Sequence, residues 1–156
     1  MANVNHSTLT GSFLHEPKGV AAAGSGTVYI ANGSGSGVWT NPQTVVPLTL
    51  TGVIDDISTA STIYFGIPYA GTIEKVVTVL EGAISGSDAT ITVKNASAAS
   101  MGTITVANSS SAAGDVDTLS PSTNNSISAN SFMTVETNGA STGHKNLYVT
   151  VTLDRT

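Results

Sequence analysis

The chain has no cysteine and little positive charge, and each absence excludes a class of protein. Without cysteine it forms no disulfide and offers no thiolate ligand to a metal. It has five Lys and Arg against ten Asp and Glu, which gives a net charge of −5. The basic residues are scattered, whereas binding to nucleic acid or anionic lipid needs them clustered, and no apolar run approaches the roughly 18 residues of a membrane span. The sequence therefore predicts neither a nucleic-acid partner nor a membrane partner.

Charge of both signs is scarce, at 10% of the chain against the usual share of about a quarter. Ser and Thr number 20 and 23, so hydroxyl groups rather than ions keep the surface hydrated. A weakly charged surface is typical of proteins that pack against partners or act outside cells. A small polar β-domain without a special partner is the alternative that the composition leaves open.

From about residue 45 onward, short segments alternate apolar and hydroxyl residues, which is the period-two pattern of half-buried strands. The clearest segment covers 145–154, where Leu and Val alternate with Tyr, Thr and Asp. Further strands are expected at 48–54, 61–67, 72–80, 88–94, 103–107 and 131–137. Asn- and Gly-rich turns separate them and no helix is convincing. This pattern predicts an all-β fold, an antiparallel β-sandwich of jelly-roll type over residues 45–156.

Two segments of this region carry more specific expectations. Residues 72–80 are rich in Val, which predicts a strand that is bulged or buried on both faces. Residues 55–61 are expected to form one helical turn capped by Asp55.

The first 44 residues lack the strand alternation and predict an extended N-terminal arm. Residues 5–40 hold the only Trp, two of the three His and seven of the sixteen Gly. Short strands are expected at 27–31 and 38–40, joined by the turn NGSGSG into a hairpin. Because an isolated two-stranded hairpin is marginal in water, it needs a partner surface from its own domain, a neighbouring copy or a scaffold.

Two features of the arm resemble chemical sites but lack the required spacing. The glycine-rich segment 33–37 is not followed by the Lys and the Ser or Thr of a phosphate-binding loop. His6, His15 and Glu16 do not have the spacing of a helical or fingered metal site. These residues are expected to lie on a surface or an interface.

Two carboxylate pairs leave further alternatives open. Asp115 and Asp117 alternate, so their side chains share a face, whereas Asp55 and Asp56 are adjacent and point apart. Either pair keeps a calcium site or a pair for glycoside hydrolysis open as a lesser alternative. No serine lies in a nucleophile elbow. We therefore expect no enzyme, no catalytic residue, no bound metal and no cofactor.

Two stretches resemble structural proteins of tailed-bacteriophage virions. The first runs from Asn5 to Thr40, with LHEPKGV from Leu14 and VYIANGSGSGVWT from Val28, and resembles the N-terminal region of head-decoration or head-fibre proteins. The second, residues 70–154, resembles a phage virion β-domain through AGTIEKVVTVLEGAISGSDATITVKN, SAAGDVDTLSP and VETNGAS followed by LYVTVTL. The two stretches cover most of the chain.

The resemblance implies a virion structural protein on the outer surface of the capsid, where it bridges subunits of the major capsid protein, often as a homotrimer. Residues 1–44 are then the capsid-binding arm with its short hairpin. An arm of this kind follows a groove or adds strands to exposed edges, and a trimer multiplies three weak contacts. The residues expected to contact the shell are Phe13, Leu14, His15, Glu16, Pro17 and Lys18, with Tyr29 and Trp39 as packing anchors.

Two alternatives accompany this interpretation. Tyr29 and Trp39 are equally compatible with ordinary packing inside the hairpin. The whole chain is also compatible with a fibre or knob module that binds a host cell surface or glycan through the loops at 108–123 or 138–145.

Overall fold

The computed structural model describes residues 23–34, 36–42 and 46–155. Over these ranges the protein is all-β with antiparallel strand pairing and has no α-helix, so no described helix could cross a membrane. Contacts divide the chain into two compact units, residues 1–45 and 46–156. The first contains a hairpin and the second contains the remaining strands.

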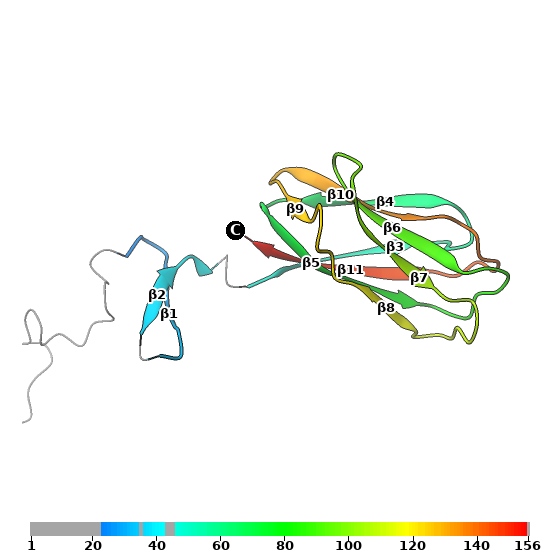
Figure 1. Ribbon diagram of the computed structural model, residues 1–156, viewed down its shortest axis with the longest axis horizontal. Helices are drawn as coiled ribbons and strands as arrows, with labels where there is room; N and C mark the ends of the chain where they lie inside the picture. Colours follow the sequence, from blue (N-terminus) through cyan, green and yellow to red (C-terminus); the bar gives the residue numbers. More distant parts are fainter. Residues whose placement is uncertain (1–22, 35, 43–45, 156) are drawn as a thin grey trace, which may run out of the picture. The chain divides into compact units, whose positions relative to one another are not determined.

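The strands of the second unit form two antiparallel sheets (Figure 1). One sheet has the order β4-β10-β6-β7, and the other has the order β3-β11-β5-β8, with β9 also paired to β5. The bounds are β3 Leu48–Ile54, β4 Ser61–Ile67, β5 Gly71–Leu80, β6 Ala89–Asn95, β7 Ser100–Val106, β8 Val116–Leu119, β9 Ser126–Ile127, β10 Ser131–Thr137 and β11 Leu147–Arg155.

Both sheets contribute side chains to one hydrophobic core. The predicted alternation is confirmed along β11, where Leu147, Val149, Val151 and Leu153 are buried and the residues between them are not. It is also confirmed along β6 and β7. The largest fully buried side chains are Ile54, Ile57, Ile67, Ile73, Leu80, Ile91, Met133, Leu147, Leu153, Val76, Val93 and Val106.

The predicted irregularity in the Val-rich strand is a bulge in β5. The register with β11 shifts between Thr152, which pairs with Lys75, and Leu153, which pairs with Ile73, so Glu74 is the extra residue. A bulge lets two residues oppose one and changes which faces they occupy. As a result Ile73 and Val76 are both buried although they lie three residues apart.

Three local features differ from the sequence-based expectation. β8 and β9 lie in segments without a clear alternation and exist through their pairing with β5. The connection after β3 was expected to be a helical turn capped by Asp55. It is instead a tight turn in which the Thr59 N–H donates to the Asp56 carbonyl at 3.3 Å, and the Asp56 side chain caps it. Ile54 and Ile57 are both buried, which fixes the backbone on either side of the two aspartates. With the backbone so placed, it is the Asp56 carboxylate and not that of Asp55 that accepts from Ser58 and Thr59 and caps the turn.

Candidate functional site

The hairpin of β1 (Val28–Ala31) and β2 (Gly37–Thr40) holds the two predicted contact residues that the structure describes. The strands pair antiparallel, and Tyr29 lies directly opposite Trp39. Their ring centroids are 5.3 Å apart with planes tilted by 59°. A tilted aromatic pair contributes about 0.5–1.5 kcal/mol beyond the burial of its area. The two rings therefore hold one face of the hairpin together.

The turn between these strands forms through side-chain and backbone hydrogen bonds of Asn32. Its amide oxygen accepts from the N–H groups of Ser34 at 2.9 Å and Ser36 at 3.2 Å, and its own N–H donates to the Ser36 carbonyl at 2.8 Å. Gly37 has no Cβ, and a Cβ there would overlap the Ile30 carbonyl and lie 2.9 Å from the Tyr29 ring. The glycine-rich turn thus lets the Tyr29 ring lie close over the backbone of β2.

The opposite face of the hairpin is aliphatic. Val28 is 40% exposed and Val38 is 62% exposed, while Ile30 is half-buried. A two-stranded hairpin with apolar side chains on both faces is a surface suited to binding another protein, because burying those side chains is favourable.

The other predicted shell contacts cannot be placed. Phe13, Leu14, His15, Glu16, Pro17 and Lys18 lie outside the described residues. Of the predicted binding residues, the structure therefore brings together only Tyr29 and Trp39.

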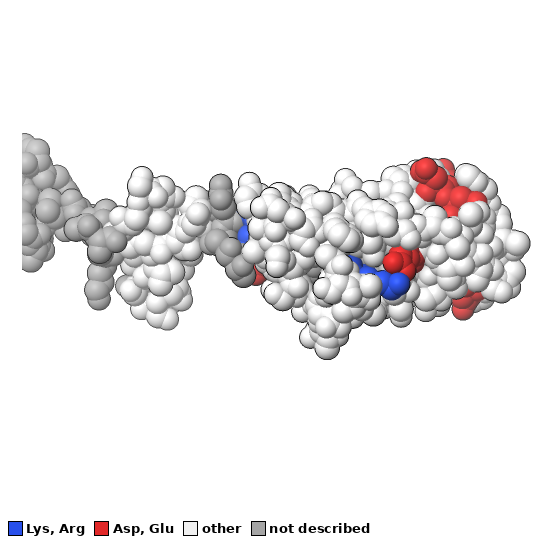
Figure 2. All heavy atoms as spheres, turned by 90° about the horizontal axis from the view of Figure 1, so that it is seen from above, with Lys and Arg blue, Asp and Glu red and all other residues white. Residues whose placement is uncertain are grey.

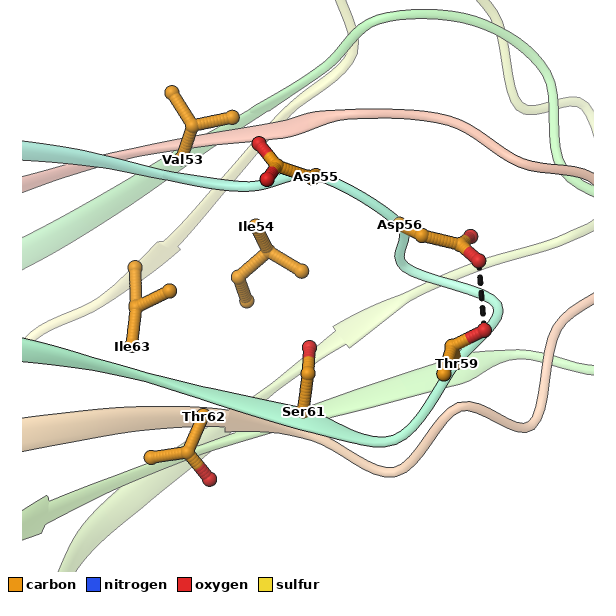
Figure 3. A pocket seen from close by; sticks show the side chains of 8 residues that line it. All are labelled: Val53, Ile54, Asp55, Asp56, Thr59, Ser61, Thr62 and Ile63. Carbon is orange, nitrogen blue, oxygen red and sulfur yellow. Dashed lines mark hydrogen bonds between the residues drawn. The ribbon is translucent and has the colours of Figure 1, made fainter.

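A hollow of about 330 Å³ lies between β3 and β4, beside the turn that joins them (Figure 3). Its apolar lining comes from Val53, Ile54 and Ile63. Its polar lining comes from Asp55, Asp56, Thr59, Ser61 and Thr62. Because β3 and β4 are the end strands of their two sheets, this hollow lies where neither sheet continues.

The Asp56 carboxylate beside this hollow is already engaged in holding the turn. Its Oδ1 accepts from the Ser58 N–H at 2.9 Å and the Ser58 hydroxyl at 2.6 Å, and its Oδ2 accepts from the Thr59 hydroxyl at 2.7 Å, the bond drawn in Figure 3. These bonds, that of the Ser58 hydroxyl first, lower the pKa of Asp56 from 3.8 to about 2. A carboxylate so stabilised in its charged form is a poor general acid, so its role is structural.

The pH dependence of folding should show this role. Since the pKa of Asp56 is depressed in the folded state, its contribution to stability is complete above 3.8 and is lost as the pH falls toward about 2. We expect Asp56→Asn, which cannot titrate, to lose less stability than the unaltered protein over that interval. Urea unfolding at a series of pH values measures this. If the free energy of unfolding of Asp56→Asn falls with pH as steeply as that of the unaltered protein, the assignment is contradicted.

The second carboxylate pair takes part in the packing of β8. Asp115 Oδ2 accepts from the Ala112 N–H at 2.7 Å. Asp117 lies opposite Thr78, and burial, together with the Asp115 charge, raises the pKa of its carboxyl. Within the described residues no three His, Cys, Asp or Glu side chains gather as they would around a metal ion.

An exposed aromatic pair lies on the outer face of the other sheet. Tyr64 on β4 is 70% exposed and Phe132 on β10 is 40% exposed, with ring centroids 5.7 Å apart. Lys94 and Glu136, joined by an ion pair of 2.5 Å, lie on the same sheet. Tyr64 meets Phe132 only because β4 pairs with β10, which no local pattern in the sequence reveals.

Charged side chains are sparse on the face of the protein seen in Figure 2, where they form small separate groups. No model of a known protein family matches the sequence, and no curated protein matches it. What the molecule offers toward a function is therefore its hairpin, its weakly charged β-unit and the resemblance of its motifs.

Proposed function

We propose that this protein is a structural component of a tailed-bacteriophage virion that decorates the outside of the capsid. Residues 1–44 act as the arm that docks on the major capsid protein, and residues 45–156 form the outward domain. No catalysis and no cofactor are involved. The proposal joins the resemblance of the arm and β-unit motifs to the character of the described surfaces.

The observation that carries the proposal is the hairpin. It belongs to a unit with its own contacts, separate from the β-unit, and it presents the paired Tyr29 and Trp39 rings on one face and exposed Val28 and Val38 on the other. Aromatic side chains are enriched at protein interfaces and dominate their energetics. A small two-faced hairpin of this kind is stabilised when a larger protein covers it.

The architecture of the β-unit supports an exposed location. We interpret its two antiparallel sheets and shared core as a β-sandwich of jelly-roll type, an architecture common in capsid-associated domains. Its surface is rich in hydroxyl groups and carries little charge, which is compatible with a domain that projects outward from the capsid. A homotrimer, which the resemblance implies, would let three arms bind with high effective concentration.

The proposal is tested by binding of the full chain to capsids that lack it. We expect Trp39→Ala to weaken binding roughly tenfold or more, because truncation of a buried aromatic anchor typically removes at least that much affinity. Co-sedimentation over a concentration series measures the loss, and the thermal unfolding of the β-unit should not change.

The matched control is Ser34→Ala in the turn of the same hairpin, since the interaction that Ser34 makes there uses its backbone N–H. This variant should bind capsids as the unaltered chain does. If Trp39→Ala and Ser34→Ala bind equally well, the hairpin is not the docking element.

A second candidate function is a fibre or knob module that binds a host glycan. The exposed pair of Tyr64 and Phe132 favours it, because an aromatic surface beside hydrogen-bonding groups such as Lys94 and Glu136 suits the apolar face and hydroxyls of a sugar. Undiminished capsid binding by the Trp39 variant would make this the stronger candidate.

A further inference from the structure

β3 is an end strand whose outer edge has no neighbour among the described residues. Half of its backbone N–H and C=O groups therefore point away from the sheet, which is a template for a further strand. Natural proteins usually block such an edge with a charge, a proline or a bulge. The sequence of β3, LTLTGVI, contains no charge and no proline, and its register with β11 is regular.

The inner side of this edge is also incompletely covered. Leu48 and Leu50 of β3 and Ile63 of β4 pack against the core but are only partly buried. The hollow between β3 and β4, which Ile63 helps to line, lies at the C-terminal end of β3 (Figure 3). A neighbour that extended the sheet along β3 would satisfy the free backbone groups and cover these three aliphatic side chains.

We infer that β3 pairs antiparallel with β3 of a second copy of this chain, about a two-fold axis at Thr51. Thr51 is the middle residue of the strand, so this register alone pairs all of Leu48–Ile54. Leu50 then lies opposite Gly52, over which the Phe65 ring and the Ile63 side chain already pack. Inner-facing residues oppose inner-facing ones along the whole strand, as sheet pairing requires.

Electrostatic complementarity favours a second copy over another partner. Asp55 and Asp56 follow the C-terminal end of β3. Arg155 lies at the opposite end, where its guanidinium donates to the Val46 carbonyl at 2.6 and 3.2 Å. Antiparallel pairing brings Asp55 and Asp56 of each strand to the end of the other that holds Arg155, with Asp154 beside it, and no charged residues within the strands come to lie opposite one another.

This contact is independent of the proposed capsid function. It uses β3 and not the arm, and a two-fold contact can coexist with a three-fold one because each uses its own surface. Failure of the hairpin experiment would therefore leave the pairing of β3 untouched, and the reverse also holds.

Single-cysteine crosslinking of the full chain tests the pairing, since the chain has no cysteine of its own. In Thr51→Cys the two thiols would face each other across the axis, within the Cα separation of about 4.4–6.8 Å that a disulfide needs. We expect mild oxidation to give a covalent dimer as the major product. In Thr49→Cys, a control at another exposed position of the same strand, the two thiols would lie four residues apart along the paired strands, about 14 Å, and should stay uncrosslinked.

Charged substitutions at Thr51 give a second test, in which light scattering measures the reversible association of two copies. Thr51→Lys and Thr51→Asp should each lose the two-fold contact, because like charges would then lie opposite one another, and a mixture of the two should regain it. Equal crosslinking of the two cysteine variants, no crosslinking of either, or a mixture that associates no better than its components would each overturn the inference.

Discussion

Replacing Ile91 by alanine is expected to lower the free energy of unfolding of the β-unit by about 2–5 kcal/mol. Ile91 is fully buried on β6, an inner strand of its sheet. It lies opposite Thr137 of β10 and Ile104 of β7, so packed neighbours on both sides limit how far the structure can collapse into the space left behind. Both the lost burial and the remaining cavity contribute to the loss.

The neighbouring residue supplies the control. Thr92 faces the other way, toward Glu136 and Thr103 on the outer side of the sheet, and Thr92→Ala should change the free energy of unfolding by no more than about 0.5 kcal/mol. Urea unfolding followed by circular dichroism measures the free energy of unfolding of both variants. An unchanged dependence of that free energy on urea concentration would indicate that the unfolded state is not altered. Comparable losses for the two variants would mean that this sheet does not face the core as described.

Most strands were predictable because their pattern is local. The expected strands at 48–54, 61–67 and 131–137 agree with β3, β4 and β10 residue for residue. In each of these strands apolar side chains recur at alternate positions and face the core, as Ile63, Phe65 and Ile67 do in β4, so the period-two pattern is recognisable.

β8 and β9 could not be predicted because their stability is not local. β8 has only four residues, one of them Asp117, and β9 has two. Both exist because the long strand β5 provides an edge with which they pair. Such a strand is a property of the sheet and not of its own sequence.

The candidate site was predictable to a similar extent. The hairpin followed from two short apolar segments around a glycine-rich turn, and the pairing of Tyr29 with Trp39 follows once Asn32 sets the turn. The aromatic pair of Tyr64 and Phe132 was not predictable, since it joins residues far apart in sequence. The free edge of β3 was equally hidden, because only the sheet order reveals which strand lies at an end.

Replacing Gly139 by alanine is expected to produce the second large loss of stability. Gly139 follows Asn138 in the connection after β10 and has a φ of 65°, a left-handed conformation that costs other residues about 1–2 kcal/mol. An added Cβ would overlap the backbone nitrogen of Ala60 and lie 2.7 Å from the Thr59 carbonyl carbon. Neither backbone atom can move aside as a flexible side chain would, which adds about 1–3 kcal/mol of overpacking.

Gly114→Ala separates the two contributions. Gly114 has a φ of 89°, but nothing lies within 4 Å of the position its Cβ would take, so only the backbone strain applies. Chemical denaturation should therefore rank Gly139→Ala as clearly less stable than Gly114→Ala. Equal losses would show that the turn at Gly139 is not packed against the β3–β4 connection.

Gly139 and Asp56 both affect the connection between β3 and β4. Asp56 holds it through Ser58 and Thr59, whereas Gly139 allows the neighbouring turn to approach Thr59 and Ala60. Substitutions that disturb one shared element are not additive. Since the first substitution already displaces the connection, Gly139→Ala combined with Asp56→Asn should lose less stability than the sum of the single losses. A strictly additive pair would place the two effects in independent parts of the protein.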